Sequence, residues 1–234
     1  MKKILLLCCL LMTITFSATA AQNTAEERTI IVSGSGLVKA SPDVAYVNLG
    51  VSDEKRSAKE AQTSVNQTMN LVLAALDKIP IAKEKIKTTR INLSPRYEYN
   101  SGKRNFKGFT ASNEIKITLD NLSLIGKCID TSLNAGANDI NYLSFGIKEQ
   151  DTLKNEALRK AFGKAQDKAK SLAKAAGVKL GKLITIQESS ADLVIPRGRM
   201  LAQKVADEGL GGGTPVAPGE IEVHGNLTAV FEIR

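Results

Sequence analysis

The 234-residue chain contains one histidine, His224, so any serine or cysteine nucleophile that needs an imidazole base would have to use it. Period-two counting along the final apolar stretch places His224 on the opposite face from the apolar row, between Val223 and Gly225. The Gly-x-Ser-x-Gly pattern of a nucleophile elbow occurs nowhere in the chain. These features argue against a serine hydrolase.

The sequence also gives little support for a metal site or for a catalytic pair of carboxylates. A zinc site needs several cysteine, histidine or carboxylate ligands, and a calcium site needs a spaced acidic loop that this chain lacks. The acidic pairs Glu26-Glu27 and Asp53-Glu54 are adjacent, which in a strand points their carboxylates apart. Nothing in the sequence identifies a pair of carboxylates that would act together in a glycosidase. We expect no catalytic residue, cofactor site or metal site, and therefore no enzyme.

Gly34-Ser35-Gly36 could suggest a phosphate-binding loop, but the expected third glycine is missing and no helix follows. Because the glycines lie inside a predicted strand, they indicate a bulge or a close approach of another backbone.

Two groups of basic residues could contact an anion. One lies beside Tyr97, Tyr99 and Phe106 near a predicted hairpin tip, and the other recurs every four residues along a predicted helix. A solvated hairpin end and a solvated helix face are the alternative interpretations. The candidate ligand contacts are Lys103, Arg104, Lys107, Lys160, Lys164 and Lys168.

Residues 1–21 have the pattern of a bacterial export signal. Two lysines precede an apolar run from Ile4 to Phe16, and Ala18-Thr19-Ala20 supplies the small residues of a cleavage site near Ala20 or Ala21. A membrane anchor would need about 20 apolar residues. A lipoprotein signal would need a small residue, not leucine, before Cys8. We predict a cleaved signal peptide and a periplasmic protein, and association with the outer membrane stays open.

Removal of the signal changes the composition. Cys128 becomes the only cysteine, which excludes an intramolecular disulfide, and its apolar neighbours Ile125 and Ile129 favour burial. Of the 32 basic and 24 acidic residues, the signal removes Lys2 and Lys3, which leaves a net charge of +6. An exported chain with 4% aromatic residues is not expected to bind nucleic acid, but it could contact an anionic envelope polymer or membrane surface.

Hydrophobic periodicity predicts an α+β fold of antiparallel sheets with packed helices, in the order ββαββαβαββ and in two intimately associated lobes. The Ser41-Pro42-Asp43 turn is predicted to pair the first two strands. Two helices have clear inward faces: one follows the capping box Ser57-Ala58-Lys59-Glu60, and the other carries an alanine every fourth residue. Strands are expected at 30–38, about 44–51, 142–147 and 182–188, and from Ile221. A hairpin is expected from strands at 86–99 and 109–119, with a polar tip at 100–105. Helices are expected after the capping box to Ile79, at 122–135, and at 152–176, the last capped by Asp151.

The predicted domain organisation is a signal peptide at 1–21, a flexible mature N-terminus at 22–28, and one domain at 29–234. Within that domain, residues 190–219 hold three prolines and a glycine cluster and are predicted to be a mobile insertion. Its apolar residues, among them Ile195 and Leu201, favour docking either on a neighbouring subunit or on its own domain.

Several short motifs, in their order and spacing, resemble the SIMPL-domain family, whose bacterial members include periplasmic YggE-like proteins. The resemblance covers about residues 29–234 and implies an exported α+β protein without a defined active site, which assembles into large rings or channel-like oligomers and is linked to oxidative stress defence. It supplies no catalytic residues. The motifs are Gly34-Ser35-Gly36 through Pro42-Asp43-Val44-Ala45, Ser94-Pro95-Arg96-Tyr97-Glu98-Tyr99, Gly108-Phe109-Thr110-Ala111-Ser112-Asn113, Ala135-Gly136-Ala137-Asn138, the helix from Ala157-Leu158 through Ala173, Gly177-Val178-Lys179-Leu180-Gly181 and Pro218-Gly219-Glu220-Ile221.

Two hypotheses follow. The first is a non-enzymatic envelope protein that works as a homo-oligomer, with strand edges and the long hairpin as interfaces. The second is a monomeric module that binds an anionic envelope ligand through the basic residues named above, with salt-sensitive affinity.

Overall fold

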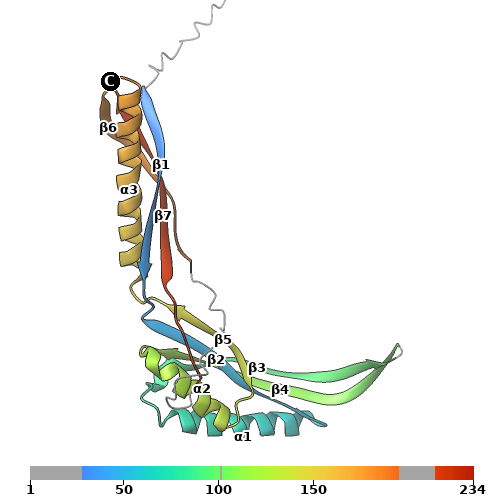
Figure 1. The fold of residues 1–234 in the computed structure, drawn as a ribbon. Helices are drawn as coiled ribbons and strands as arrows, with labels where there is room; N and C mark the ends of the chain where they lie inside the picture. Colours follow the sequence, from blue (N-terminus) through green and yellow to red (C-terminus); the bar gives the residue numbers. More distant parts are fainter. Residues whose placement is uncertain (1–27, 101, 195–213) are drawn as a thin grey trace, which may run out of the picture.

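The computed structural model describes residues 28–100, 102–194 and 214–234. They form two lobes that meet at a corner and give the molecule the outline of an L (Figure 1). Each lobe is an antiparallel sheet with helices on its outer side, so the predicted α+β class and element order are confirmed.

The upper lobe consists of strands β1 (Thr29–Ala40), β7 (Ile221–Ile233) and β6 (Leu180–Val194), in that spatial order, and helix α3 (Gln150–Ala175). The lower lobe contains β2 (Val44–Lys55), β3 (Ile86–Asn100), β4 (Lys103–Leu119) and β5 (Asp139–Gly146), with helices α1 (Ala58–Leu76) and α2 (Ile125–Asn134). Its sheet order is β3-β4-β2-β5, and short 3₁₀ turns lie at Lys83–Lys85 and Leu122–Leu124.

The predicted pairing of the first two strands is wrong. β1 pairs with β7, and β2 pairs with β4 and β5, so β1 and β2 belong to different lobes. The link between them is fastened to the end of β5 instead: the Asp43 N–H donates to the Gly146 carbonyl at 3.1 Å, and the Lys148 N–H donates to the Asp43 carboxylate at 2.9 Å. Residues 41–43 therefore form the corner of the L, not a hairpin turn.

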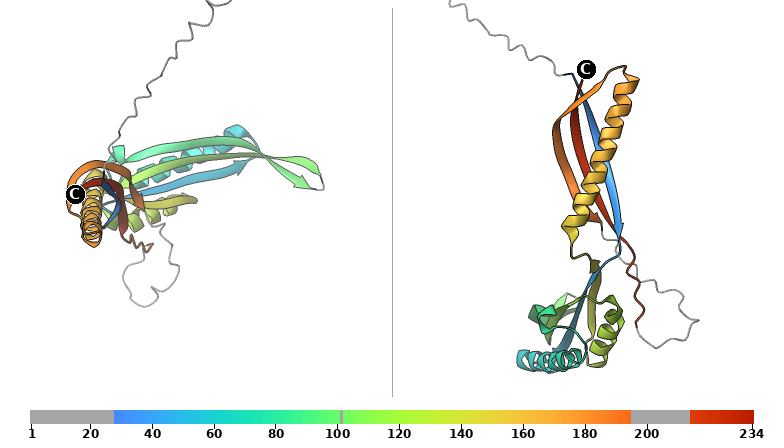
Figure 2. Two further views of the ribbon diagram at one scale, coloured as in Figure 1. Left: turned by 90° about the horizontal axis from the view of Figure 1, so that it is seen from above. Right: turned by 90° about the vertical axis from the view of Figure 1, so that its left-hand side faces the viewer.

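Helix α3 lies along the face of the upper sheet and covers β1 and β7 (Figure 2). Its stripe of alanines is completely or almost completely buried against β1 and β7. A Cβ built on Gly34 or Gly36 would overlap the carbonyl of Ala161 or Ala157, respectively. The predicted close backbone approach at Gly34-Ser35-Gly36 is confirmed, since only glycine leaves room for the helix. The buried alanines are Ala157, Ala161, Ala165, Ala169 and Ala173.

The lower lobe holds the larger hydrophobic core, between its sheet and helices α1 and α2. The Ser57 hydroxyl accepts a hydrogen bond from the Glu60 N–H at 3.3 Å, which confirms Ser57 as the cap of α1. The predicted inward face of α1 is also confirmed, with Val65, Met69 and Val72 buried against the sheet.

The lobes share the core at the corner. Ile221 begins β7 of the upper sheet, yet its side chain is buried among residues of the lower-lobe core. Just before it, Thr214 is held on α2, where its hydroxyl donates to the Asp130 carboxylate at 2.7 Å and its N–H donates to the same carboxylate at 3.2 Å. These contacts fasten the chain that precedes β7 to the lower lobe.

Several predicted boundaries need correction. Asp151 does not cap α3, because the helix begins at Gln150 and the cap residue Glu149 makes no side-chain bond. The hairpin strands run to Asn100 and from Lys103, so most of the expected polar tip is strand. Strand β6 continues to Val194, beyond its expected end at Glu188, and residues 214–219 precede β7 without helix or strand structure. Residues 195–213 and the predicted signal peptide lie outside the described residues.

Candidate functional site

His224, the one histidine of the chain, lies on β7 of the upper sheet. It lies opposite Leu37 and Asp192 in the upper sheet, and its Nε2 is 3.4 Å from the Glu222 carboxylate. Among the residues that the structure describes, no three His, Cys, Asp or Glu side chains gather as a metal ion would require. Within the same residues, no helix is long and apolar enough to span a membrane.

Cys128 is completely buried on α2, as its apolar neighbours predicted. Burial raises the pKa of its thiol to about 12, because the apolar surroundings disfavour the thiolate. Since the thiolate is the reactive form, this cysteine is poorly suited to redox chemistry in the folded protein.

We predict that Cys128 in the native protein does not react with a thiol-specific dye at pH 8, whereas the denatured chain reacts fully. The reason is both steric and electrostatic: the side chain is inaccessible and its pKa lies far above the pH of the experiment. Dye incorporation into residues 22–234, with and without denaturant, measures this. Rapid labelling of the folded protein would show that α2 opens readily.

The structure brings the candidate hairpin residues together with the nearby aromatic side chains. Arg104 lies 3.5 Å from the centre of the Tyr97 ring, and Phe106 contacts Tyr97 edge-on with ring centres 5.6 Å apart. Lys107 forms an ion pair with Glu98 at 2.7 Å and holds the pKa of that carboxyl below its usual value. The third candidate, Lys103, pairs with Asn100 at the end of the hairpin.

The root of this hairpin contains a hollow of about 350 Å³ that the sequence did not reveal. Its basic side chains come from the end of β2, from β3 and from β4, so only the folded sheet brings them together. Arg96 forms an ion pair there with Glu54. A register shift at Arg96/Tyr97, opposite Gly108 with φ +134°, bends the hairpin at this place. The lining residues are Glu54, Lys55, Arg56, Glu60, Arg96, Lys107, Gly108 and Phe109.

The lysine row occupies the other lobe. Lys160 pairs with Glu156 of the same helix at 2.9 Å, and Lys168 donates to the Ser33 carbonyl on β1 at 2.8 Å. Lys164 lines a shallow depression on α3 together with Lys168. Because α3 and the hairpin belong to different lobes, the two groups of basic residues do not form one binding site.

Comparison with known proteins identifies the family of this chain. A family model named SIMPL, described as a protein of unknown function (DUF541), matches residues 30–231. The chain belongs to the SIMPL family.

Relatives that resemble the chain include two proteins from different bacteria. The 26 kDa periplasmic immunogenic protein of Brucella melitensis is 34% identical over 221 residues, which cover 91% of this chain and 88% of that protein. The uncharacterized protein YggE of Escherichia coli K12 is 29% identical over 177 residues, or 76% of this chain and 72% of YggE. Neither name describes an enzymatic activity.

Proposed function

We propose that this SIMPL-family chain is an exported envelope protein that acts through self-assembly, without catalysing a reaction, and that contributes to oxidative stress defence.

Two observations support export to the periplasm. The first 21 residues have the basic start, apolar run and small-residue cleavage site of a signal peptide. The Brucella relative that shares 34% of its residues carries the word periplasmic in its name.

The observation that carries self-assembly is the position of the exposed apolar side chains. Most large apolar residues that are exposed in the described parts of the chain lie on the strands at the sheet edges. An open edge offers unpaired N–H and C=O groups, and apolar side chains beside it favour pairing with another chain. The edge residues are Ile31, Leu37, Ile91, Leu93, Tyr99, Tyr142, Leu183, Ile184 and Ile186.

The role in oxidative stress defence follows from the family resemblance. Protection is not expected to use thiol chemistry, since Cys128 is the only cysteine of the mature chain and is buried with a raised pKa.

Light scattering coupled to size-exclusion chromatography tests this proposal. Residues 22–234 should elute as a homo-oligomer whose mass is several times that of one chain. A strictly monomeric mass over the accessible concentration range would refute self-assembly.

A further inference from the structure

Two strands of the molecule, β3 and β6, are exposed along most of their length. Each contains 15 residues, and each lies at an edge of its sheet with one neighbouring strand. By contrast, the edge strand β1 buries alternate residues under α3. Long open edges of this kind are the places where proteins pair with another strand.

The helix-facing side of β3 is apolar and uncovered. Ile91 and Leu93 pair across the sheet with Asn113 and Ala111, and Ala111 is buried in the core beneath α1. Helix α1 packs mainly on β2 and β4 and only marginally on β3. As a result, Ile91 and Leu93 remain 63% and 43% exposed on a face that is otherwise the inside of the lobe.

Strand β6 of the upper lobe also has an apolar helix-facing side that its helix leaves uncovered. Leu183 and Ile186 pair with Phe231 and Ala229, which are buried beneath α3. Because α3 covers β1 and β7 but hardly reaches β6, Leu183 and Ile186 remain 42% and 49% exposed. A hollow of about 540 Å³ lies between α3 and β6, and its apolar lining residues are Leu158, Phe162, Ile186 and Leu227.

The charges on the two strands are opposite in sign. β3 carries Lys87, Arg90 and Arg96 against one acid, Glu98, for a net charge of +2. β6 carries Glu188 and Asp192 against one base, Lys182, for a net charge of −1. Two copies of β3 would repel each other, whereas β3 beside β6 would attract.

We infer that β3 of one copy pairs with β6 of a second copy of this chain. This pairing rests on the proposed self-assembly and names the two surfaces that meet. With both helix layers on the same face of the joined sheet, Ile91 and Leu93 lie beside Leu183 and Ile186 of the second copy and close a shared apolar core between α1 and α3. Since Pro95 has no N–H to donate, the pairing uses the part of β3 before it.

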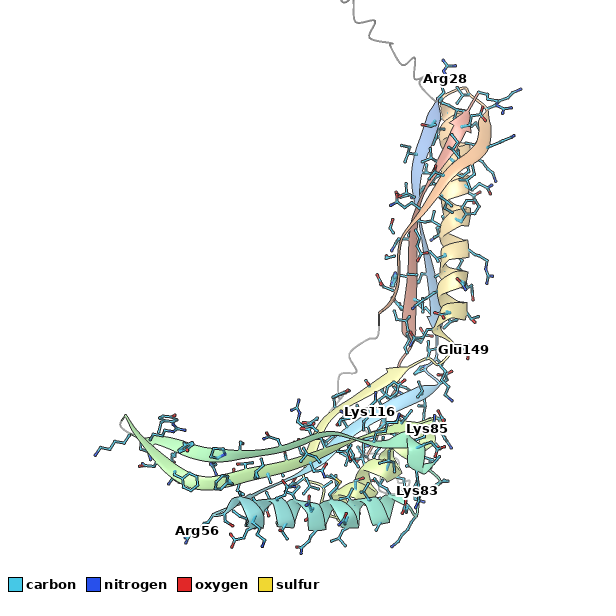
Figure 3. All side chains as sticks on the ribbon, turned by 180° about the vertical axis from the view of Figure 1, so that it is seen from behind. Arg28, Arg56, Lys83, Lys85, Lys116 and Glu149 are labelled. Atoms are coloured by element: carbon cyan, nitrogen blue, oxygen red, sulfur yellow. The ribbon has the colours of Figure 1, made fainter. Side chains whose placement is uncertain are left out.

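The pairing must be between chains, because β3 and β6 of one chain belong to separate sheets in separate lobes. Figure 3 shows how far the lobes diverge: Arg28 marks the free end of the upper lobe, and Arg56 marks the hairpin side of the lower lobe. A contact between two different surfaces leaves one free surface on each chain, so it propagates to a closed ring or an open chain of subunits.

Cysteine cross-linking tests the pairing. The double variant Leu93→Cys/Ile186→Cys, treated with a short bismaleimide, should give a ladder of covalent multimers, whereas each single variant alone should give none. A mixture of the two single variants, allowed to exchange subunits, should give covalent dimers only. Buried Cys128 is left unsubstituted, and the chain without added cysteines measures the background cross-linking from Cys128.

The matched control is Leu93→Cys/Ile31→Cys. Ile31 is 66% exposed, against 49% for Ile186, but it lies on β1, at the opposite edge of the sheet that contains β6. This control should give no ladder. Cross-linking of Leu93→Cys alone, or a ladder only in the control, would overturn the pairing. A large mass by light scattering without a 93–186 cross-link would refute the pairing and leave self-assembly intact, whereas a monomeric mass would refute both.

Charge reversal provides a second test that leaves the apolar residues untouched. Lys87→Glu/Arg90→Glu and Glu188→Lys/Asp192→Lys should each shift the chain from oligomer to monomer at low salt. The combination of all four substitutions should restore the oligomer, because the two edges again have opposite charge. Unchanged mass in both charge-reversed variants would contradict the pairing.

Discussion

Replacing Gly36 by valine should lower the free energy of unfolding by about 3 kcal/mol or more. A Cβ at this position would overlap the carbonyl of Ala157 and lie 2.8 Å from the Ala161 nitrogen. Both atoms belong to the backbone of α3, so no side-chain rotation can relieve the overlap and the helix must move away from the sheet. That movement would uncover the alanine stripe, which is buried in the core of the upper lobe.

Denaturant unfolding followed by circular dichroism measures this effect. The matched control is Gly163→Ala, since Gly163 lies in the middle of α3 and a Cβ there meets nothing within 4 Å. Alanine is the better helix former, so the control should gain about 0.5–1 kcal/mol. Equal stability of the two variants would show that α3 does not pack on the glycines as closely as described.

Replacing Ile221 by alanine should cost about 2–5 kcal/mol, the range for large-to-small changes in a tightly packed core. Ile221 is 1% exposed and lies in the lower-lobe core, although it belongs to the upper sheet. The cavity therefore opens where the lobes join, and both lobes should lose stability together.

Thermal unfolding of the variant, compared with Ile31→Ala, tests the role of this residue. Ile31 lies on the same sheet but is largely exposed, so its truncation should change stability by no more than about 0.5 kcal/mol. If Ile221→Ala were no worse than this control, the corner would not be a packed junction between the lobes.

The sequence predicts the elements of this fold better than their pairing. Alternating apolar residues identify β7, and the four-residue alanine repeat identifies α3 and its inward face. The partner of β1 could not be found in this way, because β7 lies at the other end of the chain and no local signal connects the two. Pro42 and Asp43 have the chemistry of a turn, but that chemistry also suits a corner between two sheets.

The same limit applies to the candidate binding residues. Lys107 and Arg104 were identified from their charge and their aromatic neighbours, which is local information. Their partners Glu98 and Tyr97 lie across the hairpin, and the hollow beside Arg56 depends on three strands coming together. Gly108, with φ +134°, lies opposite the register shift that bends the hairpin, and sequence periodicity alone did not reveal its role.

The exposed apolar edges connect these findings to the proposed function. Helix α1 covers β2 and β4 of the lower sheet, and α3 covers β1 and β7 of the upper sheet, which leaves β3 and β6 largely uncovered. A monomer would keep these apolar side chains in water. Pairing between copies would bury them without any change in the fold.

If the protein acts as an assembly, the mass of residues 22–234 in solution shows it most directly. Light scattering across a hundredfold range of concentration, at low and at physiological salt, should give a mass several times that of the single chain. A mass equal to one chain under all of these conditions would contradict self-assembly.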